Sequence, residues 1–216
     1  MTSLRFHLDF VSPYAYVGWA HAKRLAAAYQ RELEPVPVVF GALLGAHGTR
    51  GPAEVPAKRA YVVKDAYRKA RRAGLPIAPP PTHPFHTIAS LRVASVPAEP
   101  ELRHRVIDAL FTATWVGGGG VETMEQIRAA LEAAAIEPDE ILATAVTQEN
   151  KDRLRAATEE AIAAGVFGVP TVLVDGELFW GVDSFDALGD HLAGREHVPH
   201  ELLERWASIA PSATRE

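Results

Sequence analysis

Strand-like segments stand near the two ends of this chain, and the long stretch between them is helical. Residues 3–11 read as a short strand, residues 13–33 have the apolar spacing of a helix, and a second strand is expected at about residues 36–40. Near the C-terminus, two β-rich runs meet at Asp175-Gly176, which tolerates positive φ and favours a hairpin, and a capped helix follows. The chain is therefore a β-α-β unit, a helical block and a β-β-α unit.

The helical block sets the expected domain boundaries. A first helix is expected in "EVPAKRAYVVKDAYRKARRAG". Further helices are expected at about residues 86–96, 99–115, 122–135, 138–147 and 149–164. We predict a discontinuous α/β domain and two further parts: the α/β domain takes residues 1–42 and 166–196, an inserted helical domain takes 43–165, and a C-terminal helix and tail take 197–216.

Composition argues against several classes of function. The 22 Lys+Arg and 27 Asp+Glu residues leave a formal net charge of −5, which does not suit a nucleic-acid partner. No apolar run approaches the roughly 20 residues of a membrane span, and the N-terminus lacks a signal-peptide pattern, so we expect a cytoplasmic protein with no membrane partner. Cysteine is absent, so no disulfide, thiolate metal site or protein thiol nucleophile can form, and we expect no metal.

The segment "DFVSPYAY" places Ser12 and Pro13 at the join between the first strand and the first helix. Serine is among the best N-caps and proline is common at the first helical position, so capping by itself explains this pair. A serine nucleophile would need a base such as histidine within hydrogen-bond reach, and no Gly-x-Ser-x-Gly elbow surrounds Ser12. From the residues alone, a cap is favoured over a nucleophile.

Four separated motifs together resemble a known family. "DFVSPYAY", "GALLG…GTRGPAEVPAKRAY", "HPF" and "GVFGVPTVLVDGELFWGVDSF" resemble, in order and spacing, the 2-hydroxychromene-2-carboxylate isomerases and the related kappa-class glutathione transferases. The resemblance covers almost the full chain and implies an α/β, thioredoxin-like fold with a large DsbA-like helical insertion. It also implies that Pro170 is cis and faces the active-site helix.

In this resemblance, residues 12–15 stand where thioredoxin-like oxidoreductases carry Cys-x-x-Cys. Thiol–disulfide exchange needs an attacking protein thiolate, so the absence of cysteine excludes an oxidoreductase. The family uses glutathione for the missing sulfur, which implies a glutathione cofactor whose thiol is held by Ser12 as the catalytic residue. The physics agrees, because a helix N-terminus favours an anion and lowers a thiol pKa from its usual value of about 8.5.

The resemblance implies the remaining site residues as well. Glutathione would contact Ser12, Thr49, the backbone of Val169, Pro170, the backbone of Val182, and Asp183. Asp183 suits an N-cap equally well. The substrate would be a small aromatic carboxylate that contacts Tyr14, Lys58, Phe85 and His86. Apart from the resemblance, Tyr14, Tyr16, Phe85, Phe179 and Trp180 suit the wall of an apolar pocket for an aromatic substrate. Phe179 and Trp180 alternate along a strand, so at least one of them is expected in the core instead. Three positions depart from the usual family pattern, in which asparagine is common at Thr49 and His86 and arginine at Ser184.

The implied reaction interconverts 2-hydroxychromene-2-carboxylate and trans-o-hydroxybenzylidenepyruvate in aromatic catabolism, and relatives suggest a homodimer. Two alternatives stay open. One is a kappa-like glutathione S-transferase, which releases the glutathione adduct as its product. The other is a non-catalytic thioredoxin-fold binding module that has lost its cysteines.

Overall fold

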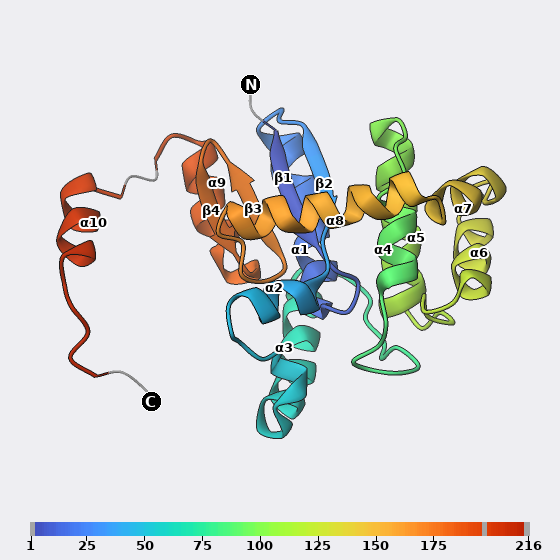
Figure 1. The fold of residues 1–216 in the computed structure, drawn as a ribbon, viewed down its shortest axis with the longest axis horizontal. Helices are drawn as coiled ribbons and strands as arrows, with labels where there is room; N and C mark the ends of the chain where they lie inside the picture. The colour runs from blue at the N-terminus through green and yellow to red at the C-terminus, as the bar shows by residue number, and fades with distance from the viewer. Residues whose placement is uncertain (1–2, 196–197, 214–216) are drawn as a thin grey trace.

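The computed structural model describes residues 3–195 and 198–213, and at its centre lies a four-stranded sheet of order β2-β1-β3-β4 (Figure 1). β1 (Leu4–Leu8) runs parallel to β2 (Leu33–Pro37) and antiparallel to β3 (Thr171–Val174), which forms a hairpin with β4 (Glu177–Trp180). The strands of the two chain ends thus share one sheet. The expected hairpin at Asp175-Gly176 is confirmed, and both residues have positive φ.

The second strand begins earlier than predicted. The register pairs Leu4 with Leu33 and Leu8 with Pro37, so the predicted strand at about 36–40 and the predicted helix over 13–33 are both wrong at their ends. Helix α1 (Pro13–Ala28) ends where Gln30 takes a φ of 51°. Two prolines fit within β2 because it is an edge strand of the sheet, where a missing N–H costs no ladder hydrogen bond.

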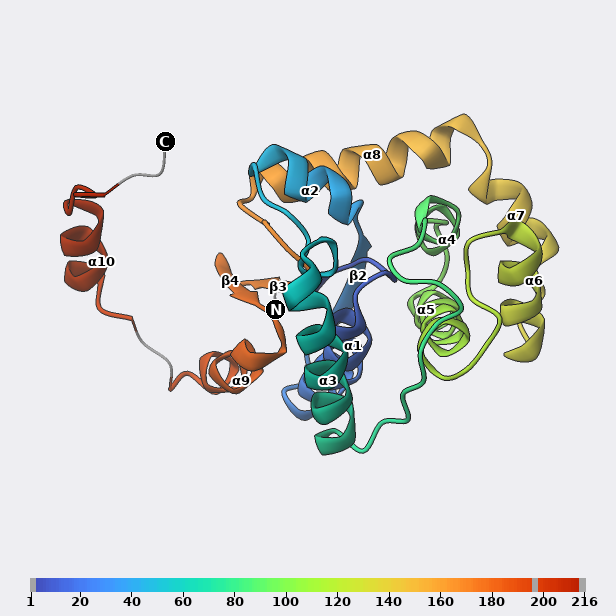
Figure 2. The same ribbon diagram turned by 90° about the horizontal axis from the view of Figure 1, so that it is seen from below.

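Helices cover both faces of the sheet (Figure 2). One face carries α1, α3 and α9, and the other carries α2 and α8, while α4 to α7 pack beyond the β2 edge. The bounds are α2 (Phe40–Ala46), α3 (Pro56–Arg72), α4 (Ile88–Ala94), α5 (Pro100–Trp115), α6 (Met124–Ala133), α7 (Asp139–Ala145), α8 (Gln148–Ala163) and α9 (Phe185–Leu192), with short 3-10 turns η1 (Pro52–Glu54) and η2 (Val182–Ser184). The helices predicted between 86 and 164 are confirmed to within a few residues at each end, and α2 was not predicted. The domain boundaries at 42/43 and 165/166 stay a prediction.

The larger core joins β1 to α1 and α5. Phe6 of β1 packs on Trp19 of α1 with ring centroids 5.4 Å apart, and Phe10 meets Phe111 of α5 edge-on at 4.8 Å. A smaller core beneath α8 includes Val36, Val38 and Val166. The chain between β1 and α1 is therefore held between packed elements on both sides.

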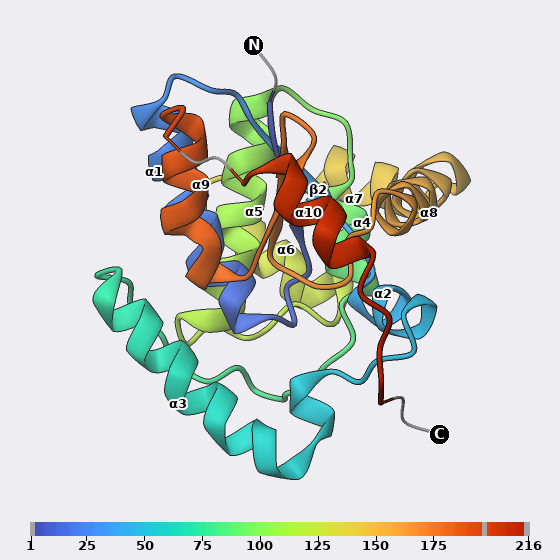
Figure 3. The same ribbon diagram turned by 90° about the vertical axis from the view of Figure 1, so that its left-hand side faces the viewer.

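The C-terminal helix α10 (His200–Ala207) lies apart from the rest of the protein in Figures 1 and 2, and in Figure 3, which is viewed from its side, it is drawn in front of the sheet region. It confirms the predicted C-terminal helix. The end of the predicted tail, residues 214–216, is outside the described residues. Within the described part of the chain, no helix combines the length and apolar character needed to cross a membrane.

Candidate functional site

The Ser12 hydroxyl lies between the N-terminus of α1 and the segment that leads into β3. Ser12 is 7% exposed and has an extended backbone, and its Oγ accepts a hydrogen bond from the Ala15 N–H at 3.2 Å. The same hydroxyl donates to the Val169 carbonyl at 3.3 Å. The predicted N-cap is confirmed, and one side chain links the helix start to a residue 157 positions away.

Pro170 faces this helix, as the family resemblance implied. The Val169–Pro170 peptide bond is cis. A Cβ placed on Gly18 of α1 would lie 3.0 Å from Pro170 Cγ and 3.4 Å from Val182 Cγ1, so the proline ring and Val182 rest directly on the glycine. The Pro170 carbonyl accepts from the Gly181 N–H at 2.8 Å, which ties this segment to the end of β4.

Two main-chain donors next to the Ser12 hydroxyl have no acceptor among the described residues. They are the N–H of Tyr14, which is the first donor of α1 because Pro13 has none, and the N–H of Val169. A helix N-terminus with a free N–H favours an anion, and a free strand-like N–H favours pairing with an extended peptide. The residues around Ser12 therefore fit a peptide that carries a thiolate.

No histidine activates Ser12 as a nucleophile. Within the described chain, the Ser12 hydroxyl bonds only to Val169 and Ala15. Two histidines considered as bases are occupied elsewhere, since a His83 ring nitrogen lies 3.0 Å from the Val11 carbonyl and a His7 ring nitrogen lies 3.3 Å from the Thr171 carbonyl. The geometry favours a hydroxyl that donates to an anion over one that attacks.

Asp9 is a buried carboxylate that the sequence analysis missed. Its Oδ1 accepts from the Val11 N–H at 3.1 Å, its Oδ2 accepts from the Phe40 N–H at 3.0 Å, and its carbonyl accepts from the Ser12 N–H at 3.1 Å. Burial raises the pKa of Asp9, although the Phe40 and Val11 N–H groups that donate to its carboxylate act to lower it. Asp9 thus joins the Ser12 loop to the start of α2. The only signal in the sequence is one acid within the apolar run "HLDFV".

Tyr14 and Asp183 are joined through α3. The Tyr14 hydroxyl donates to Asp65 Oδ2 at 3.0 Å, and burial together with Asp65 raises the pKa of Tyr14. Lys69 Nζ lies 3.5 Å from Asp65 Oδ2 and 2.5 Å from Asp183 Oδ1. The alternative role of Asp183 as an N-cap is wrong, because Asp183 lies inside η2 and the residue before α9 is Ser184. The Ser184 hydroxyl donates to the Gly181 carbonyl.

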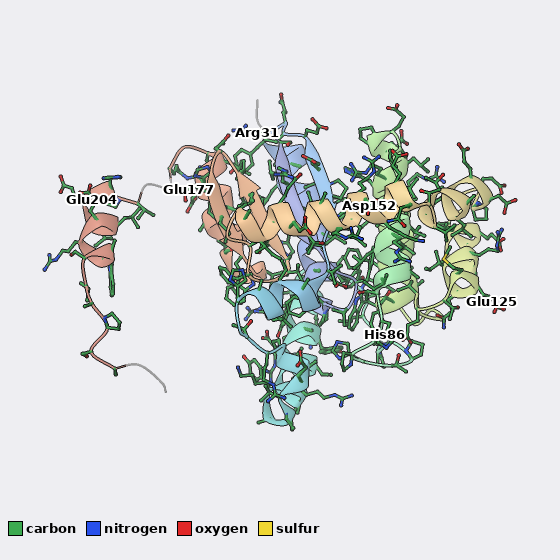
Figure 4. All side chains as sticks on the ribbon, viewed as in Figure 1. Arg31, His86, Glu125, Asp152, Glu177 and Glu204 are labelled. Atoms are coloured by element: carbon green, nitrogen blue, oxygen red, sulfur yellow. The ribbon has the colours of Figure 1, made fainter. Side chains whose placement is uncertain are left out.

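Four other predicted contacts lie on exposed or peripheral positions. Thr49 follows α2 and Lys58 lies in the first turn of α3, and both are exposed. Phe85 is half-buried against the larger core, whereas exposed His86, labelled in Figure 4, donates its backbone N–H to Glu122 at 3.2 Å. No hydrogen bond or ion pair described in the structure joins these four side chains to Ser12.

The five aromatic side chains predicted to wall one pocket do not do so. Tyr16 donates to the Pro76 carbonyl at 2.7 Å and packs near Phe111. Phe179 is part of the larger core, whereas Trp180 is exposed and meets Phe167 with ring centroids 4.9 Å apart. Phe179 and Trp180 are neighbours on β4 and point to opposite faces of the sheet, so they cannot line the same cavity. The expectation that at least one of them lies in the core is confirmed by Phe179.

A family model described as a DSBA-like thioredoxin domain matches residues 3–193. The chain is similar to glutathione S-transferase kappa 1 of Caenorhabditis elegans, at 23% identity over 94% of this chain and 96% of that protein. It is also similar to the 2-hydroxychromene-2-carboxylate isomerase of Sphingobium xenophagum, at 24% identity over 88% of this chain and 97% of that protein.

Solved structures carry the same fold. A 2-hydroxychromene-2-carboxylate isomerase superposes with a TM-score of 0.80 at 20% identity, over 96% of this chain and 99% of that one. The cytosolic disulfide reductase DsbM of Pseudomonas aeruginosa superposes with a TM-score of 0.63 at 15% identity, over 96% of this chain and 100% of that one. The predicted thioredoxin-like fold with a DsbA-like insertion is confirmed.

Proposed function

Because this chain belongs to the DSBA-like thioredoxin domain family, we propose that it is a glutathione-dependent isomerase in which Ser12 stabilises the thiolate of bound glutathione. Its similarity to both 2-hydroxychromene-2-carboxylate isomerases and kappa-class glutathione transferases supports glutathione chemistry in this family. DsbM, a protein of the same fold, is named a disulfide reductase. Disulfide exchange requires a protein thiolate, and this chain has no cysteine, so we do not propose that activity for it.

The position of the Ser12 hydroxyl is the observation that carries this proposal. The hydroxyl donates to the Val169 carbonyl, so a thiolate beside it would take over that hydrogen bond as a charged and stronger acceptor. The Tyr14 N–H and the positive end of α1 would add to this stabilisation. When bound, glutathione supplies the nucleophilic sulfur that the chain lacks.

The chain itself would bind and orient glutathione at two further points. The free Val169 N–H beside Pro170 would pair with the extended backbone of the cysteinyl residue. Asp183, with the backbone of Val182 beside it, would receive the γ-glutamyl ammonium. We keep Thr49 as a further glutathione contact.

The substrate proposed for this site is 2-hydroxychromene-2-carboxylate, interconverted with trans-o-hydroxybenzylidenepyruvate. Lys58 would anchor its carboxylate, and Tyr14, Phe85 and His86 would contact its aromatic part. A cytoplasmic homodimer active in aromatic catabolism completes the proposal.

A kappa-like glutathione transferase is the second candidate, favoured by the 94% of this chain that aligns with a kappa-class relative. The two activities share the thiolate site and differ in the fate of glutathione. An isomerase returns free glutathione at the end of each turnover, whereas a transferase consumes it. Titration of free thiol after many turnovers on 2-hydroxychromene-2-carboxylate separates the two.

Glutathione binding by wild type and Ser12→Ala tests the proposal. We expect saturable binding by calorimetry and a bound thiol pKa between about 3.5 and 7.5 in the wild type, read from thiolate absorbance, and a pKa closer to about 8.5 in Ser12→Ala. Ser184→Ala is the matched control, because its hydroxyl also lies before a helix but donates to the Gly181 carbonyl. The control should keep the wild-type thiol pKa.

Absence of binding at millimolar glutathione would contradict the proposal. Ser12 would then be a helix cap in a non-catalytic thioredoxin-fold module. An unchanged thiol pKa in Ser12→Ala would instead remove Ser12 from the role of thiolate holder.

A further inference from the structure

Lys69 is a largely buried cation that connects two carboxylates of different exposure. Its side chain is 19% exposed, and its Nζ lies between Asp65 of the same helix and Asp183 of η2. Burial alone would lower the pKa of Lys69, but Asp183 and Asp65 together raise it. Lys69 is therefore charged at neutral pH.

The inner carboxylate is fixed and the outer one is open to solvent. Asp65 is 17% exposed and accepts a hydrogen bond from the Tyr14 hydroxyl at 3.0 Å, so it stays beside Lys69 through two interactions. Asp183 is 83% exposed, and Lys69 is its only ion-pair partner within the described residues. An ion pair with one exposed partner contributes little to stability in water, so an incoming charged group can replace it at little cost.

The two groups present one negative and one positive charge at the same place on the surface. The end of a γ-glutamyl peptide presents the complementary set, since its α-carbon bears an ammonium and a carboxylate. Asp183 alone would bind the ammonium but repel the adjacent carboxylate. The next residue, Ser184, is uncharged, and its hydroxyl is already bonded to the Gly181 carbonyl. The positive charge that pairs with the peptide carboxylate therefore comes from Lys69.

We propose, resting on the proposed function, that Lys69 and Asp183 together recognise the α-amino-acid end of the thiol peptide. The peptide ammonium takes the place of Lys69 on Asp183, and the peptide carboxylate pairs with the released Lys69. Asp65 and the Tyr14 hydroxyl keep the lysine in position during this exchange. Lys69 is thus a specificity-determining residue supplied by α3.

Three peptides separate the contributions of the two charges. Glutathione carries both; 4-aminobutanoyl-cysteinylglycine keeps the amine and lacks the α-carboxylate; glutaryl-cysteinylglycine keeps a carboxylate and lacks the amine. For Lys69→Met, we expect calorimetry to show about a tenfold loss of affinity for glutathione, since a hydrogen bond to a charged group is lost. The affinity for the 4-aminobutanoyl peptide should stay equal or rise, because Asp183 then has no internal competitor.

Matched variants complete the test. Lys64→Met removes an exposed cation from the same helix and should leave all three affinities unchanged. Lys69→Arg should restore most of the glutathione affinity. Asp183→Asn should weaken glutathione and the 4-aminobutanoyl peptide and leave the glutaryl peptide unaffected or bound more tightly.

The outcomes distinguish this site from the proposed function. Equal weakening of all three peptides by Lys69→Met would mean that Lys69 acts only through packing between α3 and η2, which overturns the inference. Unchanged glutathione affinity in Lys69→Met, with a Ser12-dependent thiol pKa in the wild type, would overturn the site and leave the function standing. Failure of the wild type to bind glutathione would overturn both the proposed function and the Lys69–Asp183 site.

Discussion

At the scale of single residues, the hydrogen bonds of Ser12 and Asp9 hold the segment between β1 and α1 in place. Ser12 itself was predictable, because serine followed by proline is a local signature of a helix start. Asp9 was not, because an acid at the end of a strand is commonly a turn residue, and only the folded chain shows that it accepts from both Val11 and Phe40. A local pattern identifies a cap but not a distant partner.

His7 should make the stability of the protein depend on pH. It is buried in β1, and this burial lowers its pKa from 6.5 to about 4. In the unfolded chain His7 takes up a proton near pH 6.5, so the neutral folded state loses stability as the pH falls from about 6.5 towards 4. Between about pH 7.5 and about pH 4.5 we expect the wild type to lose roughly 2–3 kcal/mol more free energy of unfolding than His7→Gln.

Urea denaturation of both proteins at the two pH values measures this difference. Asp9 also titrates with a raised pKa, but it is present in both proteins, so its effect cancels in the comparison. Identical pH dependence of the wild type and His7→Gln would show that His7 is not buried as a neutral side chain.

At the scale of elements, α1 serves the site through its first two turns. Its N-terminus presents Ser12 and the free Tyr14 N–H, and one turn further on Gly18 leaves space for Pro170. A helix that begins at Pro13 was predictable from its apolar spacing, although its end at Ala28 was not. The need for glycine at position 18 was not, because it arises from the contact with a residue near the other end of the chain.

Two glycine substitutions in helices should have opposite effects. In Gly189→Ala, the new Cβ meets nothing closer than Leu25 Cδ2 at 3.6 Å, so helix propensity should raise the free energy of unfolding by about 0.5–1 kcal/mol. In Gly18→Ala, the Cβ would lie 3.0 Å from Pro170 Cγ. Overpacking should cancel that gain and lower stability by about 1 kcal/mol, and it should weaken glutathione binding by moving Pro170 away from Ser12.

Chemical denaturation and calorimetry of both variants test this expectation. Gly189→Ala serves as the control for helix propensity. An equal stability gain in the two variants, with unchanged glutathione affinity, would show that Pro170 shifts to accommodate the new Cβ without loss of stability. Gly18 would then not be required at the site.

At the scale of the whole molecule, the fold separates into a body that carries the site and a helix that does not contribute to it. The family model matches residues 3–193 and ends before α10. Helix α10 has no buried residue, and its large apolar side chains, Leu202, Leu203 and Trp206, are exposed. The body should therefore fold without it.

Ending the chain at Arg195 tests the independence of the body. Because α10 buries no side chain, we expect a change of less than about 0.5 kcal/mol in the free energy of unfolding, and unchanged glutathione affinity. Thermal and chemical unfolding of the shortened chain measure the free energy of unfolding, and calorimetry measures the glutathione affinity. A loss of several kcal/mol would mean that α10 packs on the body in solution.

The amino-acid sequence by itself determined the order of the strands and of the helices other than α2, the cap at Ser12 and the absence of a protein thiol, because periodicity, capping and composition are read without long-range contacts. The tertiary structure decided the contacts between distant parts of the chain: where β2 begins, which of Phe179 and Trp180 enters the core, and how Lys69 meets Asp183. Ser12 and Val169 are 157 positions apart, and Lys69 and Asp183 are 114 apart. No local pattern encodes such contacts, since they form only when packing closes the sheet and brings α3 beside η2.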